Sequence, residues 1–172
     1  VHSMKDVPTQ LAKGIAQAAV LKRASYKDVL VPHPDLEDVG GIFGRGVIEL
    51  EHGITTISGS KTKETSYREQ IDTGEKVNAI VATSSIRRKA QWLNRFPHHT
   101  IETLRGNVNT RLRKLKESNW HGAIFAKAGL ERIGLLPQNS VELDWMLPAP
   151  AQGAIMVVCR EDDENCLNAC IN

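Results

Sequence analysis

From Val77 onward, short apolar segments alternate regularly with amphipathic ones. Residues 77–82, 100–104 and 122–126 have the length and apolar character of strands, and a helical segment follows each of them. The first two helices are predicted from apolar residues at i, i+4 and i+7. These residues are Ile86, Ala90, Leu93, Val108, Leu112 and Leu115. A shorter helix is expected over residues 128–133. Strands that alternate with helices predict a mainly parallel sheet with helices on its faces, an α/β fold.

Two further strands are predicted outside this regular part, over residues 14–21 and 154–159. We expect the second strand to return to the domain that contains the first. One complete α/β domain would then be inserted into part of a second. The predicted boundaries are 1–30 for part of domain 1, 31–147 for domain 2, and 148–172 for the return segment to domain 1. Within domain 2, residues 32–78 resemble an insertion, with a predicted hairpin over 47–57.

The composition is that of an ordinary globular domain: 172 residues, 41% hydrophobic and 24% charged, with a net charge of +2. It excludes collagen, disordered chains and disulfide scaffolds. No apolar run approaches the roughly 18 to 20 residues that span a bilayer, so we expect no membrane insertion. The chain opens on Val1 without a signal-peptide pattern and ends within a predicted helix. We therefore expect a fragment of a longer protein.

Three cysteines lie close together, with the spacing C-x6-C-x3-C. They are Cys159, Cys166 and Cys170. No C-x2-C pair and no histidine pair accompany them, and an odd count argues against a secreted disulfide framework. We expect reduced thiols on a buried strand and helix, no metal site, and a cytoplasmic location.

Two of the three strand-to-helix turns combine hydroxyl or amide caps with two arginines. They are residues 83–88 (TSSIRR) and 105–111 (RGNVNTR). Ligands of open α/β sheets bind at the carboxyl ends of the strands. Free N–H groups at a helix start attract anions, and the arginine fork matches carboxylate or phosphate. Residues 83–113 contain seven basic residues against one acid, Glu102. These turns predict a binding site for a polyanion.

Not every basic residue here is expected to bind the ligand. We assign Lys89, Arg95 and Arg113 to a solvated helix face, and favour the arginines of the first turns, Arg87, Arg88, Arg105 and Arg111, as ligand contacts. No phosphate-loop motif is present, and aromatic residues are not interleaved with the arginines as a nucleic-acid stacking platform requires. A small molecule with several carboxylates is favoured, and nucleic acid is not an expected partner.

The segment His2-Ser3-Met4-Lys5-Asp6-Val7-Pro8 suggests a different chemistry. It places a carboxylate beside an ammonium on irregular backbone before Val-Pro. A carboxylate can transfer a proton or stabilise a developing cation. The competing interpretation of the segment alone is an ordinary surface Lys-Asp pair.

Five ordered blocks resemble the signatures of one family, the porphobilinogen deaminases, also called hydroxymethylbilane synthases. The blocks are residues 2–8, 83–88, 104–112, 128–134 and 150–154. The resemblance implies a transferase of heme (porphyrin) biosynthesis that joins four porphobilinogen units head to tail, releasing ammonia each time, to give the linear tetrapyrrole hydroxymethylbilane. It also implies a dipyrromethane cofactor on a cysteine thioether and a fold like a periplasmic binding protein, with two α/β domains.

The resemblance also implies roles for single residues. Asp6 resembles the catalytic aspartate. The implied cofactor-binding residues are Ser3, Lys5, Thr83, Ser85, Arg87 and Arg88. The implied substrate-binding residues are Arg105, Asn107, Arg111, Arg132 and Gln152. No metal ligand is implied. Each porphobilinogen carries an acetate and a propionate, which accounts for the arginine-rich turns.

Some features of the family are not in this sequence. None of the three cysteines lies in the glycine-rich setting of the cofactor cysteine, so we expect its attachment site outside this fragment. We therefore expect that the fragment alone does not catalyse the reaction and that the parent protein is a monomer. The alternative is a non-catalytic module for small carboxylates, of the periplasmic-binding-protein type. A nucleic-acid-binding module is a more distant third.

Overall fold

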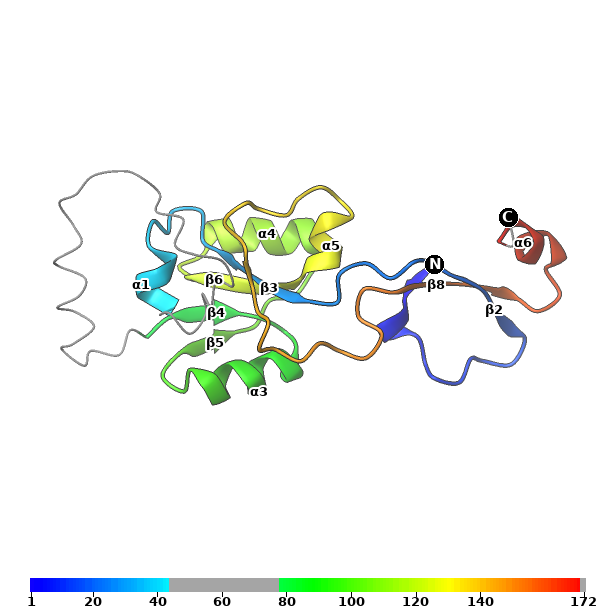
Figure 1. The fold of residues 1–172 in the computed structure, drawn as a ribbon, viewed down its shortest axis with the longest axis horizontal. Coiled ribbons are helices and arrows are strands. Elements are labelled where there is room, and N and C mark those ends of the chain that lie inside the picture. Colours follow the sequence, from blue (N-terminus) through cyan, green and yellow to red (C-terminus); the bar gives the residue numbers. More distant parts are fainter. Residues whose placement is uncertain (44–77, 171–172) are drawn as a thin grey trace. The chain divides into compact units, whose positions relative to one another are not determined.

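The computed structural model describes residues 1–43 and 78–170 of the chain (Figure 1). Two compact units make up the chain: unit 1 is Val1–Leu30 with Phe125–Asn172, and unit 2 is Val31–Ile124. The predicted hairpin at 47–57 and most of the insertion-like segment 32–78 lie outside the described residues.

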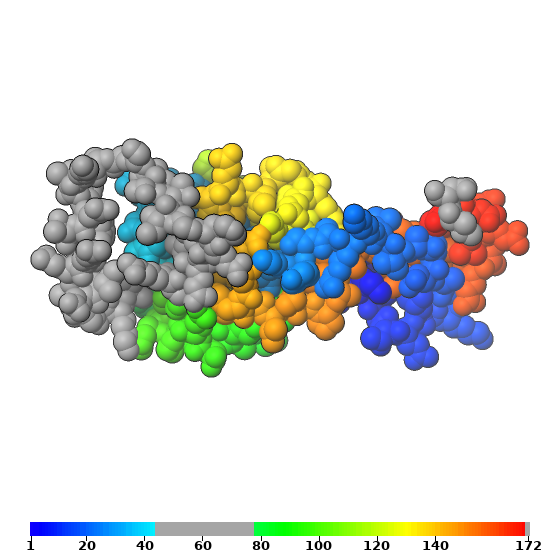
Figure 2. Space-filling view, viewed as in Figure 1, coloured from blue at the N-terminus to red at the C-terminus, as the bar shows by residue number. Residues whose placement is uncertain are grey.

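Unit 1 contains a three-stranded antiparallel sheet of order β1-β8-β2. Its strands are β1 (His2–Ser3), β8 (Ile155–Arg160) and β2 (Ile15–Val20). The central strand β8 pairs with both others, with His2 opposite Met156 and Ile15 opposite Arg160. Figure 2 shows this pairing as blue N-terminal residues beside orange and red C-terminal ones. The two strands predicted at 14–21 and 154–159 are confirmed, each shifted or shortened by one residue at its ends.

Unit 1 also contains three short helices among its described residues. The 3-10 helix η1 (Met4–Asp6) follows β1 directly, and α5 (Lys127–Glu131) covers most of the helix predicted at 128–133. Helix α6 (Glu164–Ala169) begins where the Asp163 side chain accepts a hydrogen bond from the Cys166 amide at 3.0 Å. A helix close to the C-terminal end was expected, and it is present.

Unit 2 holds the parallel strands β4 (Ile80–Ala82) and β5 (Thr100–Glu102), together with most of β6 (Gly122–Ala126). Strand β4 pairs in parallel with β5 on one side and β6 on the other. With β3 (Asp28–Pro32) and β7 (Val141–Glu142), the strand order is β5-β4-β6-β3-β7. The parallel sheet predicted from the strand and helix rhythm is confirmed for β4, β5 and β6.

Two helices connect the parallel strands of unit 2: α3 (Ile86–Arg95) joins β4 to β5, and α4 (Val108–Glu117) joins β5 to β6. The first connection leads from β4 to its neighbour β5 at the edge of the sheet. The second leads in the opposite direction, from β5 across β4 to β6. Because such crossovers are right-handed, the two helices must lie on opposite faces of the sheet. Figure 1 shows them on different sides of these strands. The short helix α1 (Val39–Phe43) contributes the buried Phe43.

The predicted apolar face of α3 is wrong. Ile86 is 85% exposed and Ala90 is exposed, whereas Arg88 and Trp92 are buried. Trp92 packs against Phe43, Phe96 and His99, and its indole N–H donates to Nδ1 of His99 at 3.2 Å. An i, i+4 spacing fits more than one face of a short helix, and the largest apolar side chain decided which face is buried. The face predicted for α4 is confirmed at Leu115, which is buried, with Val108 and Leu112 partly so.

Strand β3 was not predicted from the sequence. All five of its residues are buried, so it lacks the alternation of a half-exposed strand. It begins with a charged residue, Asp28, and ends with Pro32. Within residues 1–43 and 78–170, none of the helices has the length and apolar character needed to cross a lipid bilayer.

Candidate functional site

A pocket of about 310 Å³ lies in unit 2 beside the turns that follow β4 and β5. Its lining residues are Thr83, Ser84, Ser85, Ile86, Lys89, Ile101, Thr103 and Arg105. This is the carboxyl end of the parallel strands, where open α/β sheets bind their ligands. Three residues implied by the family resemblance, Thr83, Ser85 and Arg105, therefore line one pocket.

The turn after β4 presents hydroxyl groups to this pocket. Thr83 is only 4% exposed, and its amide donates to the carbonyl of Glu102 at 2.9 Å, which extends the pairing of β4 with β5. Its hydroxyl oxygen accepts from the Ser85 amide at 3.3 Å. Ser85 is the N-cap of α3, accepting from the amide of Arg88, and Ser84 donates to the carbonyl of Leu104. The backbone of this turn is thus fixed by bonds to β5 and the turn after it, and by bonds within the start of α3.

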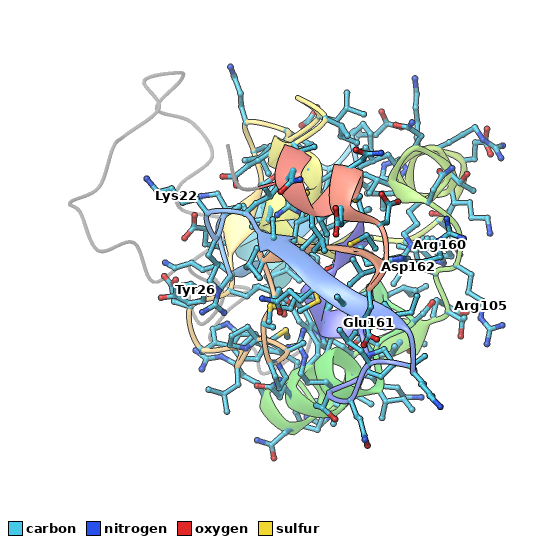
Figure 3. All side chains as sticks on the ribbon, turned by 90° about the vertical axis from the view of Figure 1, so that its right-hand side faces the viewer. Lys22, Tyr26, Arg105, Arg160, Glu161 and Asp162 are labelled. Atoms are coloured by element: carbon cyan, nitrogen blue, oxygen red, sulfur yellow. The ribbon has the colours of Figure 1, made fainter. Side chains whose placement is uncertain are left out.

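The turn after β5 starts α4. Gly106 has φ of +122°, a conformation that other residues rarely adopt, and the Asn107 side chain caps the helix by accepting from the Thr110 amide at 2.9 Å. Arg111 donates from Nε to the carbonyl of Gly106 at 2.7 Å. Arg105 is exposed at the edge of the molecule in Figure 3 and lines the pocket. Asn107 and Arg111 shape this turn and are not among the residues that line the pocket.

The two arginines that open α3 differ in their surroundings. Arg88 is 7% exposed, and Nη1 donates to the carbonyl of Ile124 at 3.1 Å, which ties α3 to the middle of β6. Arg87 is half-buried. Neither of them is among the lining residues of the pocket. Arg88 therefore has a clear role in packing, beside the cofactor-binding role that the resemblance implies.

The segment of unit 1 with Ser3, Lys5 and Asp6 forms the end of β1 and the helix η1. Asp6 is exposed, and Nζ of Lys5 lies 2.7 Å and 2.9 Å from its two carboxylate oxygens. The amide of Met4 donates to the carbonyl of Ala154 at 3.0 Å, so this segment is anchored to β8. It presents an exposed carboxylate that a neighbouring ammonium orients.

Gln152 and Arg132 belong to a hydrogen-bond network inside unit 1. Gln152 is 1% exposed, and its Nε2 donates to Oδ1 of the buried Asp28 at 2.8 Å and to the carbonyl of Tyr26 at 2.7 Å. Nη2 of Arg132 donates to the carbonyl of Gly153 at 2.6 Å. A Cβ atom at Gly153 would lie 2.5 Å from the carbonyl oxygen of Ser25, so only glycine fits there. The network holds residues 152–153 against residues 24–28.

The three cysteines are free thiols and are half-buried rather than buried. Burial, together with a hydrogen bond to Cys166, raises the pKa of the Cys159 thiol. In the part of the chain that the structure describes, no three His, Cys, Asp or Glu residues are grouped so that they could hold a metal ion.

The sequence analysis did not assign five lining residues of the pocket to the site: Ser84, Ile86, Lys89, Ile101 and Thr103. Lys89 was assigned to a solvated helix face, yet it lies one turn after Ser85 on α3 and lines the pocket. Thr103 was treated as part of a strand. It follows the last residue of β5 and lines the pocket too. The signal for Lys89 was its position four residues after the cap, which places both residues on one side of the helix.

Comparison with known proteins gives the same family as the sequence blocks. A family model described as "Porphobilinogen deaminase, dipyromethane cofactor binding domain" matches residues 1–168. The chain is 37% identical over 165 residues to a porphobilinogen deaminase of Nostoc sp., which is 95% of the chain and 42% of that protein. It is 38% identical over 164 residues to one of Rubrobacter xylanophilus, 95% of the chain and 43% of that protein.

A third relative is a probable porphobilinogen deaminase of Methanocaldococcus jannaschii, 36% identical over 166 residues, which are 95% of the chain and 44% of that protein. The chain thus spans less than half the length of these relatives. The family model covers nearly the whole chain, including unit 2 with its pocket and the segment with Asp6. The chain belongs to the porphobilinogen deaminase family.

Proposed function

We propose that the protein carrying this chain is a porphobilinogen deaminase, which joins four porphobilinogen units head to tail and releases ammonia at each step. The product is hydroxymethylbilane. The observation that carries this proposal is the family match over residues 1–168, with the relatives that share it. The basic pocket supports it, because each substrate unit brings an acetate and a propionate.

The residues present fit a dipyrromethane cofactor, the group named in the description of the matching family model. The pocket offers hydroxyl groups and two cations, and no Asp or Glu is among the described residues that line it. This donor set suits carboxylates. We assign the binding of its carboxylates to Thr83, Ser85, Arg87 and Arg88 in unit 2, and further contacts to Ser3 and Lys5 in unit 1. When bound, this group supplies the pyrrole to which substrate units are added.

Substrate binding is assigned to a second set of residues. They are Arg105, Asn107, Arg111, Arg132 and Gln152. Arg105 lines the pocket and is exposed, so it contacts ligand carboxylates directly. Asn107 and Arg111 act through the turn that they fix after β5, and Gln152 and Arg132 through the buried network of unit 1.

Asp6 is the proposed catalytic residue. Loss of ammonia breaks the bond between the aminomethyl carbon and its nitrogen, and the electron pair leaves with the nitrogen, which takes up a proton. A positive charge remains on the pyrrole ring. An ionised carboxylate stabilises this charge and accepts a hydrogen bond from the ring N–H. The exposed Asp6 carboxylate, oriented by Lys5, is suited to this role.

We extend the proposal to the whole protein. Its architecture is that of a periplasmic binding protein, with residues 1–30 and 148–172 in one domain and 31–147 in the other. It acts in the cytoplasm as a monomer, and nucleic acid is not a partner. The odd number of cysteines, which argues against a secreted disulfide framework, supports a reducing compartment.

An Asp6→Asn variant of the full-length protein that carries this chain tests the catalytic assignment. We expect porphobilinogen consumption to fall by about 10²- to 10⁴-fold, since the amide cannot stabilise the cation as a carboxylate does. Asp162→Asn is the matched control, because Asp162 is also an exposed aspartate of unit 1 beside a basic residue, Arg160 (Figure 3). Near-normal turnover of the Asp6 variant would remove this residue from catalysis. Ligand binding without any turnover in the wild-type protein would favour the carboxylate-binding module instead.

A further inference from the structure

The pocket of unit 2 contains a cation to which neither the resemblance nor the proposed function gives a role. This is Lys89, on α3, and it lines the pocket together with Arg105 from the turn after β5. We propose that Lys89 and Arg105 bind the two carboxylates of one dicarboxylate ligand, which makes Lys89 a further binding residue of this site. The inference rests on the proposed function for the identity of the natural ligand.

The position of Lys89 is fixed by the start of α3. Its amide donates to the carbonyl of Ser85 at 2.9 Å, so Lys89 lies one helical turn beyond the cap residue. Residues four apart lie on the same side of a helix, and Ser85 and Lys89 both line the pocket. Arg105 comes from a different element, and both cations are exposed. The two cations of the pocket are therefore accessible to a ligand, whereas Thr83 is buried.

The charges of Lys89 and Arg105 are not neutralised by any residue that the structure describes. Among the described residues, neither Lys89 nor Arg105 forms an ion pair through its side chain, and no carboxylate lines the pocket. Other lysines of the chain differ, since Lys27 pairs with Glu142 at 2.8 Å and Lys5 pairs with Asp6. Two cations at one pocket repel each other, and a ligand with two anionic groups relieves this repulsion. The charge balance thus favours a dianion.

The rest of the lining restricts the ligand further. Ile86 and Ile101 add apolar side chains, and Ile86 is 85% exposed, which is unusual for so large an apolar residue. Thr83 and Thr103 add hydroxyl groups that can donate to carboxylate oxygens. A volume of about 310 Å³ is at the small end of ligand pockets. The pocket suits a small apolar body with two carboxylate arms, as in a pyrrole with an acetate and a propionate.

Titration of the 172-residue chain with succinate and with acetate tests the inference, with amide NMR shifts of residues 83–89 as the readout. We expect Lys89→Ala to weaken succinate binding about threefold to tenfold, the effect of losing one charge-assisted contact at an exposed site. Acetate binding should change less than twofold, because one carboxylate can still use Arg105. Lys89→Arg should restore succinate binding, since it keeps the positive charge.

Lys116→Ala is the matched control, since Lys116 is an exposed lysine of the other long helix of unit 2, α4, and does not line the pocket. It should bind succinate like the wild type. The inference is overturned if the wild type shows no succinate-induced shifts, if Lys89→Ala binds succinate normally, or if Lys116→Ala loses as much. Failure of the proposed function gives a different result. In that case succinate binding still depends on Lys89, but the protein consumes no porphobilinogen.

Discussion

At the scale of single residues, the buried pair of Asp28 and Gln152 holds together segments 124 positions apart in the sequence. We expect Gln152→Leu to lower the free energy of unfolding by about 2 to 4 kcal/mol, because the Asp28 carboxylate loses its amide donor in a buried place. Gln152→Glu should cost more at neutral pH, since two carboxylates would then face each other. Urea denaturation of both variants at neutral pH measures which one loses more free energy of unfolding.

Acidification gives a second readout for this pair. The extra cost of Gln152→Glu should shrink as the pH falls, because a protonated carboxyl group can donate to Asp28 again. Gln138→Leu is the control, as Gln138 is exposed in the same unit, and it should leave stability unchanged. Equal stability of Gln138→Leu and Gln152→Leu would show that the buried pair contributes nothing.

The roles of single residues could be predicted from the sequence only where neighbouring residues formed a recognisable local pattern. A hydroxyl or amide cap was predicted in each of the two turns, and the structure has Ser85 as the cap of α3 and Asn107 as the cap of α4. The pairing of Gln152 with Asp28 was not predicted, because nothing local marks a partner so far away in the chain. Lys89 is exposed on α3, as predicted, but that it also lines the pocket was not predicted, because the pocket is formed together with residues of β5 and the turn after it.

At the scale of elements, the burial of α3 gives a direct test on one helix. Trp92→Ala should lower the free energy of unfolding by about 3 to 5 kcal/mol, since it removes the largest fully buried side chain and its contacts with Phe43 and His99. Ile86→Ala should change it by less than about 0.5 kcal/mol, because Ile86 is exposed. Denaturant unfolding of both variants decides the point. If Ile86→Ala lowered the free energy of unfolding more than Trp92→Ala does, the face predicted from the apolar spacing would be the buried face of α3.

Periodicity predicted where elements occur better than which way they face. β6 was predicted with its observed bounds, and α3 and α4 were predicted in their observed places, because strands and helices here alternate with clear turn signals. Strand β3 was missed since a strand buried on both faces has no polar alternation. The bulge of β2 between Gln17 and Ala19 had no sequence signal either. These features depend on neighbours in space and not on neighbours in sequence.

At the scale of the whole molecule, each compact unit contains a group whose pKa folding has shifted. In unit 1, hydrogen bonds from Lys127 and Lys27 lower the pKa of the Glu142 carboxyl group. In unit 2, burial, with His121 and His98 nearby, lowers the pKa of His99. Both groups prefer their deprotonated form in the folded state. Their contributions to stability are therefore complete above the pKa of the unfolded chain and are lost as the pH falls through the folded pKa.

The free energy of unfolding should accordingly fall in two successive stages on acidification. The first begins below about pH 6.5, where His99 of the unfolded chain takes up a proton, and the second below about pH 4.5, where Glu142 does. Denaturant unfolding from pH 8 to pH 3 measures both. His99→Asn should flatten the first stage and Glu142→Gln the second, while Glu37→Gln, which removes the same charge from an exposed position, should flatten neither. An unchanged first stage in His99→Asn would mean that the imidazole of His99 does not carry the acid sensitivity of unit 2.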